Sequence, residues 1–489
     1  MKTGYLLLTL LFVVSGISPS SPPFPDIANN ESAELHLSSN DTLLVSMFEW
    51  AVWSSKRFVG SDDDPVGPWY EATLPNRAAF CMRDVSHQCI GEEINGQGRQ
   101  NLNMMTKFVE NISESKDWCS YWEINKYNQL PREDYKSDQD FWYNLPANFD
   151  VLYACYRLYL WTGNKTYIND PRFDNFFRLT LNEYVERWQL QPELIMQRPA
   201  IMNQHPASIG SQFRNKRGIP SYDEQTRNMY VTCDLLAVIY KAFDVYANIL
   251  AYRGEQALSN EYASKAEAYR ELYDSVWWNP ATQSYYYAWM GDSFLQEGDH
   301  EMFVPWFGLV KDPVRLEKML RNIAEIDINI EIRTYYPKAY YHYGMNDIAY
   351  HYLENLYRDK RRDYPEAASG MIEGVVGGMM GIEPNAMHNI IRTCPRLTSA
   401  TQWVSIENVP TFAGIVSVLH ESKQKTSFIV KSEKEVVWRV AFPGDYARIT
   451  AGGKTVQTEK YADELGNIFS FADVVCEPGK LLTAEVSKD

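Results

Sequence analysis

The feature that most constrains the fold is an alternation of short and long connections between about twelve helical segments, from residue 42 to about residue 380. The connections from Trp161 to Pro171 and from Arg253 to Ser259 are short. The long connections are rich in proline, glycine, aromatic and charged residues, and they cover residues 58–83, 113–147, 190–227, 277–301, 327–337 and 359–367. This alternation predicts six helical hairpins closed into a ring, with every long loop joining an outer helix to an inner helix on one common face.

Apolar residues in the strongest helical segments repeat at spacings of three and four, which marks one buried face of a helix. The clearest example is Leu235, Ile239, Phe243, Tyr246 and Leu250. Residues 149–159 and 262–276 show the same spacing. The inner helices of such a ring point their N-termini at the loop face, so we expect that face to favour carboxylates and negatively polarised ligands.

The character of the sequence changes after about residue 390, where short β-type runs replace the helical repeat. These runs cover residues 415–418, 427–430, 436–440 and 447–450, and glycine-rich or proline-rich turns separate them. We therefore predict a mainly α protein, with an (α/α)6 toroid of six helical hairpins over residues 42–392 and a C-terminal β-sandwich domain over residues 393–489.

The N-terminus has the pattern of a secretory signal. Lys2 precedes the apolar run Tyr5–Val14, and small residues follow. The run is too short to span a membrane, and no cysteine follows that could carry a lipid anchor. We expect a signal peptide over residues 1–20, an N-terminal extension over residues 21–41, and a secreted or periplasmic protein without a membrane anchor.

Composition narrows the possible partners. The formal net charge of −16 argues against a nucleic-acid surface, which needs clustered lysine and arginine. The 33 tyrosines and 14 tryptophans either fill a helical core or offer flat platforms to sugar rings. Seven cysteines without a CxxC pair, and the lack of an HExxH motif, give no reason to expect a disulfide framework or a zinc site. We expect no metal and no cofactor, and the oligomeric state stays open.

Three stretches within or beside the long loops carry a family resemblance. They are Phe80–Gln88, which contains Arg83-Asp84; Gly218–Glu224 with the later Val276–Tyr286; and Arg362–Ala367 continuing through Gly381–Pro384 to Thr393–Leu397. In this order they resemble the six-hairpin, or (α/α)6-barrel, glycoside hydrolase superfamily, which includes trehalase-like, glucoamylase-like and α-L-rhamnosidase-like enzymes. The resemblance implies an exported glycoside hydrolase, exo-acting and inverting, whose substrate is an oligosaccharide or polysaccharide.

Cleavage of a glycosidic bond requires two carboxyl groups facing one pocket. We predict that Glu224 is the general acid, with its neighbour Asp223 as the competing choice, because burial beside an apolar helix would keep it protonated. We predict that Glu366 is the general base, with Glu373 two turns further along the same helix face as the alternative. Acids that merely cap a helix would produce the same local patterns.

Other residues of the loops are candidates for binding substrate. Arg83 and Asp84 together can hold adjacent sugar hydroxyls, although a buried structural ion pair would look the same in sequence. His87 lies about one turn further and could join either role. Stacking and hydrogen-bonding candidates are Trp142, Arg333, Tyr335 and Tyr336.

The substrate class is left open between neutral and anionic sugars. Arg83, Arg217, Arg227 and Arg333 all fall in or near the long loops, and such a set would suit a uronic acid. A polysaccharide lyase or an unsaturated-uronide hydrolase on the same barrel is one alternative function. A non-catalytic glycan-binding protein is another, and a helical scaffold without chemistry is the least specific.

Overall fold

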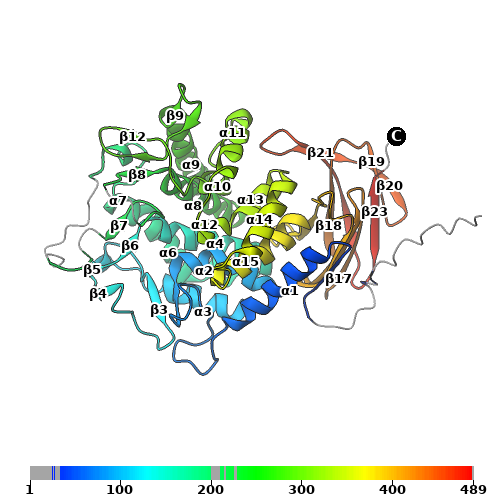
Figure 1. Cartoon of the computed structure of the whole chain (residues 1–489), viewed down its shortest axis with the longest axis horizontal. Coiled ribbons are helices and arrows are strands. Elements are labelled where there is room, and N and C mark those ends of the chain that lie inside the picture. Colours follow the sequence, from blue (N-terminus) through cyan, green and yellow to red (C-terminus); the bar gives the residue numbers. More distant parts are fainter. Residues whose placement is uncertain are drawn as a thin grey trace, which may run out of the picture.

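The computed structural model describes residues 34–199, 210–213, 216–224 and 228–486, together with Pro25 and Ile27. The helices form a toroid, and most of the longer strands gather in a β domain at one end of it (Figure 1). The predicted signal peptide and most of the predicted N-terminal extension lie outside the described residues.

The helices of the toroid alternate between outer and inner positions along the chain. The outer helices are α1 (Thr42–Arg57), α3 (Gly98–Val109), α6 (Pro171–Leu179) with its continuation to Arg187, α9 (Gln256–Val276), α11 (Pro313–Ala324) and α14 (Asn346–Arg358). The inner helices are α2 (Met82–Ile94), α4 (Pro146–Thr162), α8 (Cys233–Tyr252), α10 (Phe303–Phe307), α13 (Tyr336–His342) and α15 (Pro365–Glu373), which continues as a wider turn to Met379. Every predicted long connection leads from an outer helix to an inner one.

The inner helices pack side by side into a closed ring. Helix α2 packs between α15 and α4, α4 packs against α8, and α8 packs against α10. The ring closes where the Tyr343 hydroxyl, at the end of α13, donates a hydrogen bond of 2.6 Å to the carbonyl of Pro305 in α10. Helix α8 is long and apolar enough to cross a membrane, but most of it is buried inside this ring.

Glycines allow the closest approaches between inner helices. A Cβ atom on Gly91 of α2 would lie 2.2 Å from the carbonyl oxygen of Ser369 in α15, and one on Gly370 would lie 2.7 Å from the carbonyl oxygen of Thr334. The sequence predicts that the small residues at the start of α15 let the backbone approach a ligand. In the structure, the small residues of α15 instead allow this helix to approach α2 and the loop that contains Thr334. These contacts fix the position of the first turn of α15.

The loops that join outer to inner helices gather at the end of the toroid remote from the β domain, which we call the mouth (Figure 1). Short strands tie these loops together. The strand β6 (Tyr143–Asn144), just before α4, runs parallel to β7 (Arg217–Ile219), and β2 (Ala79–Cys81) pairs with β3 (Glu123–Asn125). A three-stranded sheet adds β8 (Val231–Thr232), β11 (Ala288–Trp289) and β12 (Phe294–Leu295).

The β domain is a sandwich of two sheets, as predicted. One sheet has the order β1-β15-β16-β17-β23-β19-β20, and the other has the order β13-β14-β18-β22-β21. Phe428 of β17 (Lys425–Lys431) stacks on Trp438 of β18 (Val436–Pro443), with ring centroids 5.1 Å apart, in the core between the sheets. The remaining strands are β1 (His36–Ser39), β13 (Glu383–Asn385), β14 (Ile390–Thr393), β15 (Val404–Thr411), β16 (Gly414–Ser422), β19 (Arg448–Ala451), β20 (Lys454–Gln457), β21 (Glu459–Ala462), β22 (Ile468–Cys476) and β23 (Leu482–Val486).

The domain boundaries differ from the predicted ones in two places. The predicted boundary between residues 392 and 393 falls inside β14, and the β domain already begins with β13. The N-terminal extension contributes β1, which pairs antiparallel with β15 and so belongs to the β domain. Pairing between segments so distant in sequence leaves no local pattern, which is why the sequence could not reveal it.

The seven cysteines are all buried and unpaired. Cys155 of α4 and Cys233 of α8 are core thiols. Cys81 and Cys89 are buried singly.

The contact of Gly91 with Ser369 predicts that Gly91→Ala destabilises the protein, because the added methyl group forces α2 away from α15. We expect a loss of about 2 kcal/mol or more, which is typical of overpacked cores, and thermal unfolding would measure it. Gly98→Ala is the matched control, because its Cβ would meet only the flexible carboxylate of Glu93. Equal stability of the two variants would contradict the role given to this contact.

Candidate active site

The first turns of the inner helices bring carboxylates to the mouth. Asp84 stands in the first turn of α2, Asp234 in that of α8 and Glu366 in that of α15, while Asp150 lies one turn into α4. All four are buried. The partial positive charge at a helix N-terminus stabilises an ionised carboxylate, so these positions reduce the cost of placing acids there.

Asp84 and Glu366 form a hydrogen-bonded carboxyl pair at the junction of α2 and α15. Each residue is only 4% exposed. Burial raises the pKa of Glu366 well above its usual range, and the neighbouring charge of Asp84 raises that pKa further. Two buried carboxyl groups in contact cannot both ionise cheaply, so the pair retains a proton near neutrality. Among the residues that the structure describes, the Glu366 Oε1 atom has no hydrogen-bond partner, which leaves it able to meet a ligand.

Arg83 connects this pair to the loop that carries Glu224. Its guanidinium lies 3.6 Å from the Glu224 carboxylate and donates a hydrogen bond of 3.3 Å to the carbonyl of Tyr222. The charges of Asp84, Glu224 and Glu366 together raise the pKa of Arg83, although burial opposes them. The regions around residues 224 and 366, which are far apart in the chain, therefore meet at Arg83 and Asp84.

Glu224 has a different environment from Glu366. Its side chain is 45% exposed, and it faces the guanidinium of Arg83. The pKa of Glu224 is raised, because desolvation outweighs the opposing charge of Arg83. Contact with water and with the guanidinium favours the ionised form of Glu224 more than the fully buried surroundings of Glu366 favour that of Glu366. The adjacent Asp223 donates its backbone N–H to the Ser221 hydroxyl, and its charge acts on His300.

Asp234 holds the loop that positions Glu224. Its carboxylate accepts hydrogen bonds of 2.6 Å from the backbone N–H of Tyr222 and 3.0 Å from the Ser221 hydroxyl. Burial raises the pKa of Asp234 to about 6, and these donors oppose the shift. The first turn of α8 thereby fixes the part of this loop that follows β7.

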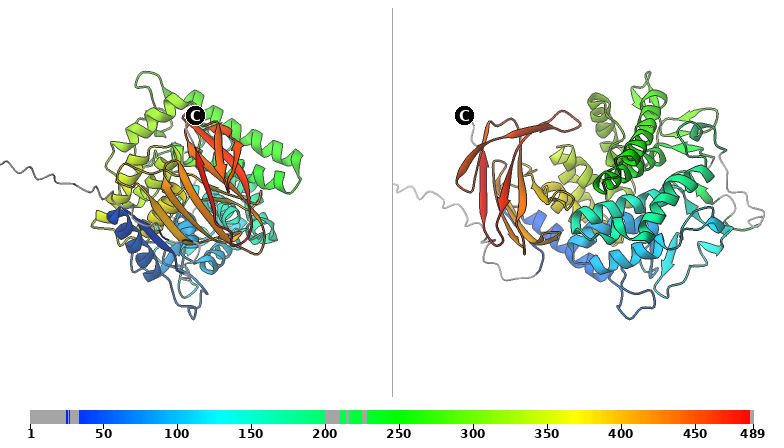
Figure 2. Two further views of the ribbon diagram at one scale, coloured as in Figure 1. Left: turned by 90° about the vertical axis from the view of Figure 1, so that its right-hand side faces the viewer. Right: turned by 180° about the vertical axis from the view of Figure 1, so that it is seen from behind.

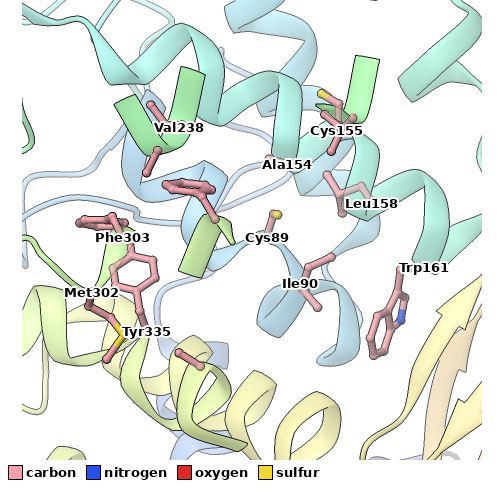
Figure 3. Close-up of a cluster of buried hydrophobic side chains, with 14 of the residues drawn as sticks. Cys89, Ile90, Ala154, Cys155, Leu158, Trp161, Val238, Met302, Phe303 and Tyr335 are labelled. Atoms are coloured by element: carbon pink, nitrogen blue, oxygen red, sulfur yellow. The ribbon is translucent and has the colours of Figure 1, made fainter. Parts of the chain in front are cut away.

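Aromatic side chains fill the axis of the toroid below the carboxyl pair. Tyr335 packs edge-on against Phe303 at 4.9 Å (Figure 3). It also packs edge-on against His87 at 4.6 Å. Tyr222 stacks on Phe303 at 4.1 Å and donates its hydroxyl to Asp150 at 2.5 Å. His87 lies 3.3 Å from the same Asp150 oxygen, and burial lowers the pKa of His87.

Some predicted binding residues lie elsewhere. Arg333 pairs with Asp359 at 2.9 Å and donates to the carbonyl of Ile328, so its charge is already satisfied within the loops. Tyr336 packs against Tyr340 and Tyr352 and thus faces the outer helix α14. These two residues do not join the cluster around Arg83.

Trp142 contacts the cluster through another residue. Its ring lies 4.2 Å from that of Trp122, and Arg83 lies over the Trp122 ring at 5.6 Å. Trp122 is therefore the aromatic ring next to Arg83, and Trp142 packs against Trp122. Glu373, the alternative base, pairs with Arg157 at 2.9 Å deeper in the toroid.

Sequence reasoning missed Asp150, Trp122 and the contacts of Tyr222 with Phe303 and Asp150. Asp150 carried a usable signal, because it is a single charged residue at the apolar start of α4. Trp122 carried no such signal, because its position depends on how distant loops pack. Within the described ranges, no group of three or more histidine, cysteine, aspartate or glutamate side chains is arranged to hold a metal ion.

Comparison with known proteins gives no matching family model and no matching curated sequence. Solved structures do match the fold. An α-L-rhamnosidase from Dictyoglumus thermophilum has a TM-score of 0.59 and 12% identity, over 93% of this chain and 50% of that one. A GH78 family rhamnosidase of Bacillus sp. GL1 has a TM-score of 0.58 and 12% identity, over 82% of this chain and 41% of that one.

The chain thus shares the fold of these two structures, a helical toroid with an attached β domain. It spans half or less of the length of the two rhamnosidase structures.

The buried Asp84–Glu366 pair predicts an unusual pH dependence of stability. Because the folded-state pKa of Glu366 is raised, the pair stabilises the fold at low pH and costs stability as the pH rises through that pKa. Glu366→Gln removes this cost while keeping a hydrogen-bond donor to Asp84. We expect the variant to be more stable than the wild type by about 1–2 kcal/mol at pH 8, with a smaller difference at pH 5.

Glu373→Gln is the matched control on the same helix, and thermal unfolding at both pH values is the measurement. This change leaves the buried Arg157 without its carboxylate partner, so it should destabilise the protein. If Glu366→Gln is less stable than the wild type at pH 8, then ionisation of the Asp84–Glu366 pair does not lower the stability of the fold.

Proposed function

We propose that the protein is an exo-acting glycoside hydrolase on an (α/α)6 toroid, with its active site at the mouth. The observation that carries the proposal is the meeting of three acids at one arginine. A buried carboxyl pair that retains a proton, Asp84–Glu366, and a half-exposed carboxylate, Glu224, both lie beside Arg83. Glycoside hydrolysis needs these two charge states in one pocket, because one group donates a proton and the other activates water or attacks the sugar.

The environments favour roles opposite to those assigned from the sequence. The general acid must hold a proton before the reaction, and Glu366 is the group whose pKa is raised well above its usual range. The general base must be ionised, and Glu224 is exposed and faces a guanidinium. We therefore propose Glu366 as proton donor, Asp84 as the partner that keeps it protonated, and Glu224 as the base.

The shape of the site supports action at a chain end. Behind the carboxyl pair, His87, Trp306, Tyr335 and Glu366 line an axial cavity of only 10 Å³. A sugar entering from the mouth therefore meets a nearly closed end, which suits a terminal residue better than the middle of a chain. Inversion at the anomeric carbon remains our proposal, and proton NMR of the first-formed anomer tests it.

The charges favour a neutral sugar over an anionic one. Arg83 lies beside Asp84 and Glu224, Arg217 pairs with Asp117, and Arg333 pairs with Asp359. Each of these arginines is already balanced by a carboxylate, so none offers a spare positive charge to a uronate. Arg227 lies outside the described residues.

The competing functions make different predictions in one assay. A lyase would produce an unsaturated sugar that absorbs in the ultraviolet, and an unsaturated-uronide hydrolase would accept only such products. A non-catalytic binding protein would bind glycans without releasing any sugar. We further propose export after cleavage near residue 20, which N-terminal sequencing of the mature protein tests.

Conservative changes at the acids test the proposal. Glu224→Gln and Glu366→Gln should each lower kcat on aryl glycosides by about 10³-fold, because each removes one proton-transfer group, while sugar binding should persist. Glu317→Gln on the exposed face of α11 is the matched control and should leave kcat unchanged. Full activity of both site variants would exclude this pair as the catalytic acids.

The assignment of roles has its own test. A substrate with a very good leaving group, such as a 2,4-dinitrophenyl glycoside, needs little proton donation. If Glu366 is the acid, Glu366→Gln should recover most of its activity on that substrate, whereas Glu224→Gln should not. Recovery by Glu224→Gln alone would restore the roles inferred from the sequence.

A further inference from the structure

A second cavity lies at the base of the toroid, the end opposite the mouth. Its volume is 360 Å³, and it is bounded by the later turns of α4, α10 and α13 and by the first residues of the β domain. The ribbon views show that the β domain sits at this end while the mouth loops lie at the other (Figure 2). The volume falls within the range of small-molecule sites, and junctions between domains are where such sites commonly form.

Aromatic side chains and charged groups line this base cavity together. Tyr153, Tyr156 and Trp306 supply aromatic surface. Arg157 pairs with Glu373 at 2.9 Å, and its guanidinium lies 5.3 Å from the Tyr153 ring and 5.5 Å from the Trp306 ring. Aromatic rings beside fixed donors and acceptors form the usual environment of a sugar ring, which has apolar faces and polar edges.

The polar groups of the cavity have bonding capacity to spare. The Nε atom of Arg157 is buried and has no acceptor within the described part of the chain. The Lys241 ammonium has three donors and contacts one carboxylate, that of Asp244, at 3.2 Å. A buried donor without an acceptor is costly, so these groups favour a ligand that brings hydroxyl oxygens.

Charge balance indicates the kind of ligand. The lining holds three cations, Arg157, Lys241 and Lys338, and three carboxylates, Glu373, Glu383 and Glu464, of which Glu383 also pairs with Arg392 and Arg396. A cavity with paired charges offers both donors and acceptors but no net attraction for an ion. It therefore suits a neutral polyhydroxyl compound better than an acidic one.

The β domain completes the wall of the cavity. The turn between β21 and β22 reaches back to the toroid, where Glu464 lies 3.4 Å from His342 at the end of α13. Trp161, another lining residue, points towards the β strands in the close-up view and donates its indole N–H to the Pro410 carbonyl at 2.7 Å (Figure 3). These contacts hold the two domains together around the cavity.

We propose that the base cavity is a second carbohydrate-binding site, separate from the mouth, that takes a neutral saccharide of one or two residues. The site uses none of the three acids that the proposed hydrolysis needs, and the proposal does not depend on whether the mouth cleaves glycosides. Trp306, Lys338 and Glu373 also line the axial cavity behind Glu366, so bound sugar would rest against the same helix that carries the carboxyl pair.

Isothermal titration of the full chain with maltose, L-rhamnose and D-glucuronate tests the proposal. We expect a neutral sugar to bind Glu224→Gln, which does not turn it over, at two classes of sites, one at the mouth and one at the base cavity. Lys241→Met should weaken binding at the base cavity by about tenfold or more, because it removes a charged donor and keeps the apolar stem. Lys311→Met, which alters an exposed lysine paired with Glu267, is the matched control and should leave binding unchanged.

Tyr156→Ala provides a second base variant in case Lys241→Met disturbs folding, and circular dichroism checks both. Turnover of aryl glycosides by the base variants should stay within about twofold of the wild type. Three results would overturn the proposal: no sugar binding beyond the mouth site, binding that neither base variant weakens, or tighter binding of D-glucuronate than of the neutral sugars at the base. If the protein hydrolyses no glycoside but still binds sugar at the base cavity, only the proposed function is refuted.

Discussion

The structure depends on the burial of two carboxyl groups against each other where α2 meets α15. Asp84 and Glu366 share a hydrogen bond in a place that water barely reaches. The close approach of Gly91 to Ser369 sets how near the two helices come, and the helix N-termini reduce the cost of the carboxyl charge. Ionising both groups would be expensive, so the fold keeps a proton at the centre of the mouth.

The rest of the mouth is arranged around this pair. Arg83, the residue before Asp84, reaches across to Glu224 and to the Tyr222 carbonyl, and Asp234 fixes the loop on which both stand. A buried acid and an exposed carboxylate with different proton affinities therefore share one arginine. This difference in environment, more than the identity of any single residue, is what makes glycosidic cleavage the reaction the site supports best.

The sequence predicted the architecture well because its signals are local. Helical periodicity marked α8 and α9, and the alternation of connection lengths placed the loops at one end. It also placed residues 84, 224 and 366 at a common face. The sequence could not predict the hydrogen bond between Asp84 and Glu366, the ion pair between Arg333 and Asp359, or the pairing of β1 with the β domain. Each of these depends on packing between distant segments. The proton affinities of Glu224 and Glu366 likewise follow from burial, which no motif encodes.

The most direct measurement is a crystal structure of the full chain carrying Glu366→Gln, with an uncleaved oligosaccharide bound at the mouth. The account predicts that the glycosidic oxygen lies within hydrogen-bonding distance, about 2.6–3.2 Å, of the side chain at position 366, with Glu224 near the anomeric carbon or its attacking water. A saccharide whose scissile bond lies away from both side chains would contradict the central claim that this carboxyl cluster performs the cleavage.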